Sequence, residues 1–131
     1  MYPEIMVIPM REELTRLGIE ELRSAADVDR FVQKESGTTM LIVNSMCGCA
    51  AGRMRPAVRL ALQNVTKPGK IGTVFAGQDL EATAQARAHF VGYPPSSPSL
   101  AILHDGEERY RAVSHRHLNG KSLSRLAVIN R

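Results

Sequence analysis

Residues 38–49 have the sequence TTMLIVNSMCGC, in which an apolar run leads directly into two cysteines. Residues 38–44 are rich in β-branched side chains, a pattern typical of a strand that is covered on both faces within an α/β sheet. Cys47 and Cys49 come just after the end of this strand, and active sites of open α/β sheets gather at the carboxyl ends of their strands. This stretch therefore predicts an α/β fold with its chemistry at the end of a central strand.

The rest of the chain alternates between helical and strand patterns. Helices are expected over residues 10–17, 24–36, 50–64, 79–90 and from 122, and strands over residues 38–44, 71–76, 99–104 and 107–114. Two βα crossovers followed by a hairpin, which the Asp105-Gly106 dipeptide favours, require a mixed sheet. We expect a single α/β domain over residues 1–131, with a mixed central sheet flanked by helices on both faces and the last strand at an edge.

Individual residues predict how the helices begin, end and face the core. Gly18 is expected to cap the first helix, and Ser24 and Asp79 to begin later ones. Pro56 predicts a kink or a late start in the helix after the cysteines. The expected inward faces are Val28, Phe31 and Val32; Met54, Val58, Ala61 and Leu62; and Leu80, Thr83, Ala84 and Arg87.

The composition is that of a globular protein. The chain has 131 residues, 44% hydrophobic and 23% charged, which excludes disordered, collagen-like and coiled-coil classes. The net charge is +4, but aromatic residues make up 5%, Trp is absent, and basic residues are mixed with acidic ones, so nucleic-acid binding is not expected. Three explanations of the positive charge remain open: a small anionic ligand, an acidic protein surface as partner, or a solvated surface without special meaning.

The first ten residues and the cysteine usage predict a cytoplasmic protein. Residues 1–10 lack the basic start of a signal peptide, and the apolar run at 40–43 is far shorter than the roughly 20 residues of a membrane helix, so no membrane association is expected. Cytosolic thiols stay mostly reduced. Cys47 and Cys49, only two positions apart, therefore indicate redox catalysis or metal binding rather than a structural disulfide.

Three interpretations of the cysteine pair remain open from the residues alone. The first is thiol–disulfide exchange: Gly48 permits the tight backbone of a Cys-x-Cys disulfide, whose small strained ring favours passage through mixed disulfides. The second is a metal site completed by His115 and His117, although the spacing matches no common zinc site. The third is a pair of inert thiols in a protein that binds partners at its sheet edge.

Several motifs together resemble the bacilliredoxin family over nearly the whole chain. They are residues 44–52, NSMCGCAAG; Arg55-Pro56; residues 75–79, FAGQD; residues 93–99, YPPSSPS; and the Asp105-Gly106 dipeptide. The resemblance implies a thioredoxin-like fold and thiol–disulfide exchange that removes bacillithiol from S-bacillithiolated proteins. It implies bacillithiol as a co-substrate, with no other cofactor and no resident metal.

The resemblance also implies roles for individual residues. Cys47 attacks the mixed disulfide, and Cys49 resolves the adduct unless a second low-molecular-weight thiol releases it. Pro98 stands where thioredoxin-like proteins carry a cis-proline, so the backbone of Ser97 is expected to pair with an extended substrate; Gly48 completes the expected substrate-binding set. Met46 departs from the family's usual smaller residue, and Arg53 and Arg116 are candidates for contact with the anionic malate part of bacillithiol.

Cys47 is predicted to titrate below a free cysteine. Backbone N–H groups at a helix start favour a thiolate by about 0.3–1 kcal/mol, which is less than one pKa unit at roughly 1.36 kcal/mol per unit. Arg53, one helical turn beyond Cys49, is expected to add to this effect. Thiolate absorbance in the ultraviolet, followed against pH, should therefore rise below the ordinary pKa of about 8.5. A flat absorbance near neutral pH contradicts the prediction.

Overall fold

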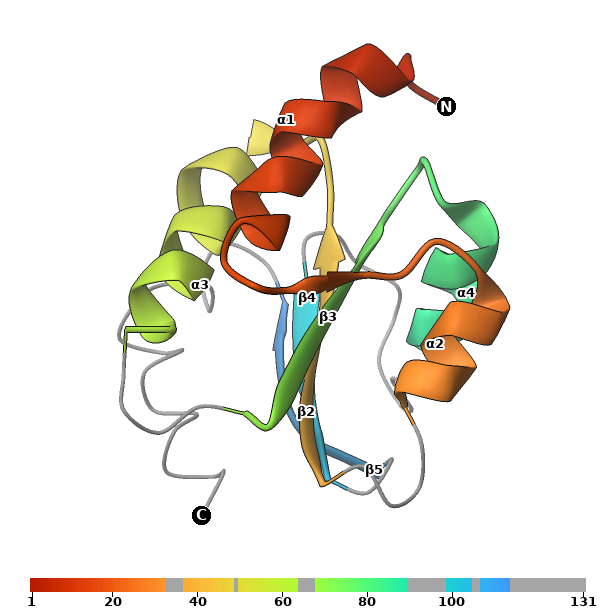
Figure 1. Cartoon of the computed structure of the whole chain (residues 1–131), viewed down its shortest axis with the longest axis vertical. Helices are drawn as coiled ribbons and strands as arrows, with labels where there is room; N and C mark the ends of the chain where they lie inside the picture. Colours follow the sequence, from red (N-terminus) through yellow and green to blue (C-terminus); the bar gives the residue numbers. More distant parts are fainter. Residues whose placement is uncertain (33–36, 49, 64–67, 90–98, 105–106, 114–131) are drawn as a thin grey trace.

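The described strands of the computed structural model form one five-stranded sheet, in the order β1-β3-β2-β4-β5 (Figure 1). The structure describes residues 1–32, 37–48, 50–63, 68–89, 99–104 and 107–113. The strands are β1 (Glu20–Glu21), β2 (Thr38–Asn44), β3 (Lys70–Phe75), β4 (Ser99–His104) and β5 (Glu107–Val113). The helices are α1 (Glu4–Thr15), α2 (Ala25–Phe31), the π-helical segment η1 (Ala50–Met54), α3 (Arg55–Ala61) and α4 (Leu80–Ala88).

The sheet is mixed, as the sequence predicts. Strand β2 pairs in parallel with β3 and antiparallel with β4, while β1 pairs in parallel with β3. Strand β5 pairs antiparallel with β4 and lies at the edge. The expected bounds of β2 and β4 match the structure, whereas Asp105, Gly106 and the helix expected from residue 122 lie outside the described residues.

Helices cover both faces of the sheet, which confirms the expected architecture. Alternate side chains of β2 enter two separate cores: Met40 and Ile42 pack on one face, and Leu41 and Val43 on the other. The first core includes Leu14, Met54 and Val58; the second includes Val28, Phe31, Ala82 and Ala86. In Figure 1, α1 and α3 accordingly lie on one side of the sheet, and α2 and α4 on the other.

Helix α1 begins at Glu4, whereas the sequence predicts a start at residue 10. Pro9 lies inside the helix, where it has no N–H to donate to the carbonyl of Ile5. Both Pro9 and Ile5 are exposed, so water can satisfy that carbonyl. The first turn is held instead by a tertiary contact, because Gln78 Nε2 donates to the Glu4 carboxylate at 2.7 Å.

A buried arginine attaches α1 to the rest of the fold. Arg11 is 4% exposed; its Nη1 and Nη2 donate to the two carboxylate oxygens of Asp79 at 2.6 and 3.0 Å, and it also pairs with Glu4 and Glu21. Its guanidinium carbon lies 5.3 Å from the centre of the Phe75 ring. Asp79 stands at the N-cap of α4, as predicted, but makes no capping hydrogen bond there. Both oxygens of the Asp79 carboxylate instead accept hydrogen bonds from Arg11.

The inward face of α4 differs from the prediction. Thr83 is buried as expected, but Leu80 and Ala84 are exposed, and Ala82 and Ala86 are buried in their place. Two alanines, with Thr83, let α4 approach α2 and the sheet closely, and the larger Leu80 remains outside. The inward face of α4 therefore follows the space between the helix and its neighbours rather than the hydrophobicity of its side chains.

The ends of the first two helices follow local sequence signals only in part. Helix α1 ends at Thr15 with Arg16 at its C-cap, so the cap predicted at Gly18 falls two residues too late. Gly18, with a φ of 86°, lies in the turn that follows and donates its N–H to the Thr15 carbonyl at 3.0 Å. Ser24 accepts a hydrogen bond from the Asp27 N–H at 3.0 Å and so caps α2. Helix α2 ends at Phe31, earlier than the predicted residue 36. The two-residue strand β1, which no sequence pattern predicts, forms through its pairing with β3.

Arg11→Met is predicted to lower the free energy of unfolding by about 3 kcal/mol, because it leaves the largely buried Asp79 carboxylate without its charged partner. Methionine keeps most of the apolar stem, so the loss reports the charge contacts. Arg16→Met is the matched control: the exposed Arg16–Glu12 pair should contribute no more than about 0.5 kcal/mol. Urea denaturation measures both variants, and equal small losses would show that Arg11 does not secure α1.

Candidate functional site

Cys47 lies on an exposed turn at the carboxyl end of β2, where the sequence predicts it. Strand β2 ends at Asn44, and the Cys47 side chain is exposed three residues later. The Cys47 carbonyl accepts hydrogen bonds from the N–H groups of Ala50 and Ala51 at 3.1 and 3.3 Å, so a helical segment begins directly after it. The Ser45 hydroxyl is 3.1 Å from the Cys47 sulfur. The sulfur is thus presented to solvent beside a hydroxyl group.

The segment after Cys47 is not a regular α-helix. Residues Ala50–Met54 form a π-helical turn, and α3 begins only at Arg55 with Pro56 in its first turn. This confirms the late start predicted from Pro56, which has no N–H to donate and crowds the preceding turn. Short π-helical turns occur frequently at functional sites. Here the turn buries Met54 and carries Arg55 inward behind the cysteine turn.

Asn44 connects the end of β2 to its surroundings. Its side chain is buried, with Nδ2 donating to the Met10 carbonyl of α1 at 3.1 Å. Its Oδ1 accepts from the Ser45 N–H at 2.9 Å and from Arg55 Nη1 at 3.1 Å. One amide side chain therefore joins the strand end, helix α1 and the turn before Cys47.

Arg55 lies behind the same turn. Its side chain is 2% exposed, and its Nη1 donates to the Ser45 carbonyl at 2.9 Å as well as to Asn44. Its Nε donates to the Glu13 carboxylate of α1 at 3.0 Å, and Glu13 is half exposed. Arg55 belongs to the Arg55-Pro56 motif, but no sequence pattern predicts this contact. The one sequence signal for it is that Arg55 directly follows Met54, which is expected to face the core.

The structure describes only part of the predicted site. Gly48 is exposed beside Cys47, and a Cβ built on it would meet no described atom within 4 Å. Arg53 is exposed on η1 and enters none of the described hydrogen bonds or ion pairs. The other predicted residues lie outside the described residues: Cys49, Ser97, Pro98, His115, Arg116 and His117.

The metal-binding interpretation also depends on residues beyond those described. Within the described ranges, no group of three or more His, Cys, Asp or Glu residues is arranged to hold a metal ion. Cys49, His115 and His117 are outside those ranges, so the Cys/His site stays an interpretation of the sequence.

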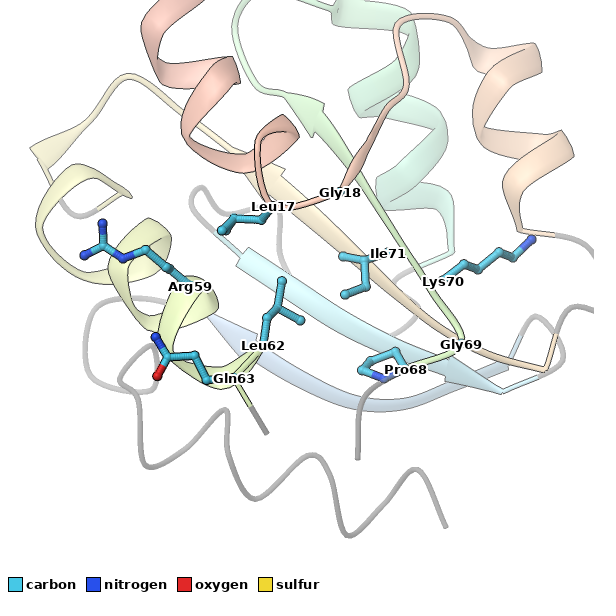
Figure 2. Close-up of a pocket in the computed structure, with 9 residues that line it drawn as sticks. All are labelled: Leu17, Gly18, Arg59, Leu62, Gln63, Pro68, Gly69, Lys70 and Ile71. Atoms are coloured by element: carbon cyan, nitrogen blue, oxygen red, sulfur yellow. The ribbon is translucent and has the colours of Figure 1, made fainter. Parts of the chain in front are cut away.

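A cavity of about 470 Å³ lies away from the cysteine turn. Figure 2 shows its lining, which comes from the residues after α1, the end of α3 and the start of β3. Since β2 and β3 are parallel, the start of β3 and the carboxyl end of β2 lie at opposite ends of the sheet. Lys70 points away from the cavity, and its Nζ lies 4.7 Å from the centre of the Phe31 ring. This cavity is therefore separate from Cys47.

Among the helices that the structure describes, none has the length and apolar character needed to cross a membrane.

Comparison with known proteins places the chain in a family. The family model described as disulphide isomerase matches residues 2–129. A bacilliredoxin of Koribacter versatilis is 62% identical over 107 residues, covering 82% of this chain and 74% of that protein. A bacilliredoxin of Salinibacter ruber is 49% identical over 128 residues, covering 96% of this chain and 75% of that protein. The chain belongs to the bacilliredoxin family.

Solved structures confirm the thioredoxin fold expected for a bacilliredoxin. Fasciola hepatica thioredoxin superposes with a TM-score of 0.65 at 17% identity, covering 86% of this chain and 100% of that one. Aeropyrum pernix thioredoxin has a TM-score of 0.57 at 18% identity, covering 78% of this chain and 82% of that one. Bacilliredoxin membership and the thioredoxin fold together support a thiol–disulfide redox function.

Asn44→Ala is predicted to lower the free energy of unfolding by about 1–3 kcal/mol, because the Ser45 N–H and the Met10 carbonyl lose a buried partner. The matched control is Gln85→Ala, which removes an amide hydrogen bond to Asp29 at the surface and should cost no more than about 0.5 kcal/mol. Denaturation of the reduced proteins compares them. Equal losses would show that Asn44 does not hold the end of β2.

Proposed function

We propose that this protein removes bacillithiol from S-bacillithiolated proteins by thiol–disulfide exchange, with Cys47 as the nucleophile. The observation that carries the proposal is the exposure of Cys47 on the turn after β2, in a chain of the bacilliredoxin family. A thiol that exchanges with a modified protein must reach a disulfide on the surface of a large partner. The exposed sulfur at the carboxyl end of β2 meets this requirement.

The proposed reaction begins with the Cys47 thiolate, which attacks the bacillithiol sulfur of the mixed disulfide. A new disulfide forms between Cys47 and bacillithiol, and the substrate protein leaves as a thiolate that takes up a proton. The Cys49 thiolate then attacks the Cys47 sulfur. This step releases bacillithiol and oxidises the two cysteines to a disulfide, so the protein supplies the two electrons that reduce the substrate.

Recycling requires a low-molecular-weight thiol as a further partner. Two molecules of such a thiol reduce the Cys47–Cys49 disulfide and leave as a disulfide. Alternatively, one molecule attacks the adduct in place of Cys49 and leaves as a disulfide with bacillithiol, which frees Cys47. In both cases bacillithiol is a co-substrate. Gly48, Ser97 and Pro98 are proposed to contact the substrate, and the cytoplasm is the proposed compartment because its thiols are kept reduced.

Disulfide isomerisation is a second candidate function. It is favoured by the family model that matches residues 2–129, which is described as disulphide isomerase. An exposed Cys47 would in that case attack a non-native protein disulfide, which forms a mixed disulfide and frees one protein thiol. A different thiol of the same protein would then attack the mixed disulfide, which forms a new protein disulfide and releases Cys47 as a thiolate. Both candidates use the same sulfur, so they differ in substrate rather than in mechanism.

The decisive experiment uses the reduced Cys49→Ser variant and a bacillithiolated model protein. The variant should gain the mass of one bacillithiol while the model protein loses it, because the adduct on Cys47 has no resolving thiol. Intact-mass spectrometry of both proteins measures the transfer. The Cys47→Ser/Cys49→Ser double variant is the control and should gain nothing.

The two functions give different results in this experiment. No transfer, with Cys47 still alkylated readily, removes the bacillithiol proposal; restored activity of a protein with scrambled disulfides would then support isomerisation. No transfer and no alkylation would contradict both functions.

A further inference from the structure

The buried guanidinium of Arg55 is linked to the Cys47 sulfur through a single residue. Arg55 Nη1 donates to the Ser45 carbonyl at 2.9 Å, and the Ser45 hydroxyl is 3.1 Å from the Cys47 sulfur. A positive charge that is 2% exposed therefore lies directly behind the turn that presents the thiol. Water screens such a charge much less than it screens an exposed one.

We propose that Arg55 is a positioning residue for Cys47, which holds the turn rigid and stabilises the thiolate form through its buried positive charge. The proposal rests on the proposed function, because it assigns Cys47 as the reacting sulfur. Arg55 acts through Ser45 and Asn44 and is not itself a catalytic residue. It replaces neither the predicted contribution of Arg53 nor that of the backbone N–H groups.

The neutralisation of Arg55 is incomplete. Among the described residues, Glu13 is its one carboxylate partner, and the Glu13 side chain is 51% exposed. The other described acceptors of Arg55, on Asn44 and Ser45, are uncharged. Arg11, by contrast, pairs with three carboxylates. Part of the positive potential of Arg55 therefore remains available to a nearby thiolate.

Removing the charge of Arg55 and removing the charge of Glu13 should shift the pKa of Cys47 in opposite directions. Glu13 on α1 and Arg55 on α3 take part in the described contacts, while Arg53 on η1 takes part in none of them. Removing the positive charge should raise the pKa of Cys47. Removing the Glu13 charge should lower it, because Arg55 then loses its counterion. A purely structural role gives no reason for opposite signs.

The experiment compares thiolate absorbance against pH in a Cys49→Ser background, so that a single thiol is observed. Arg55→Gln should raise the pKa of Cys47 by about half a unit or more, and Glu13→Gln should lower it, since nearby opposite charges favour the ionised form. Arg55→Lys, which keeps the charge, should titrate close to the parent. The control is Arg59→Gln, an equal change of net charge on the exposed face of α3, and it should leave the titration unchanged.

Shifts of Arg55→Gln and Glu13→Gln in the same direction, or no shift in either, would overturn the proposal. If Arg55→Gln fails to fold, Glu13→Gln decides alone, because its half-exposed side chain can be replaced without burying an unpaired group. A lowered pKa then supports the proposal, and an unchanged or raised one overturns it.

Bacillithiol transfer to the same variants separates this proposal from the proposed function. Opposite pKa shifts without any transfer in the Cys49→Ser parent would retain the role of Arg55 and reject bacillithiol removal. Transfer without opposite shifts would retain the proposed function and reject the role of Arg55.

Discussion

Strand β2 is hydrogen-bonded on both edges and covered on both faces, and this burial determines where the functional residues lie. Its side chains alternate between two cores, so a slip of one residue would exchange Met40 and Ile42 with Leu41 and Val43. Such a slip would also move Asn44 away from its partners on α1 and α3. The register of β2 therefore fixes the position from which Cys47 is presented.

Two buried arginines secure α1, but their surroundings differ. Arg11 lies among three carboxylates and against the Phe75 ring, so its charge is well compensated. Within the described part of the chain, Arg55 pairs with one carboxylate, the half-exposed Glu13, and donates its remaining hydrogen bonds to the end of β2. Burying a guanidinium is costly unless hydrogen bonds offset the lost hydration. Both arginines meet this condition, but only Arg55 does so beside the cysteine.

The exposed sulfur of Cys47 is consistent with the proposal that the substrate is itself a protein. Thiol–disulfide exchange requires the attacking sulfur to approach a disulfide, and a deep pocket would exclude a large partner. The cavity at the start of β3 lies at the opposite end of the sheet and contributes no residue to the turn. The turn is hydrogen-bonded instead to Asn44 and Arg55 through the N–H and the carbonyl of Ser45.

The sequence by itself determined the α/β class, the bounds of β2 and β4, the cap at Ser24, and the position of Cys47, because each depends on local periodicity or on backbone preferences of single residues. Only the tertiary structure decided that α1 continues through Pro9. The tertiary structure likewise decided that the Asp79 carboxylate binds Arg11 and makes no capping hydrogen bond to α4. In α4, it placed Ala82 and Ala86 inward instead of Leu80. It also decided that Arg55, rather than the exposed Arg53, lies behind the cysteine turn. These outcomes depend on partners distant in the chain, whose contacts outweigh local propensity.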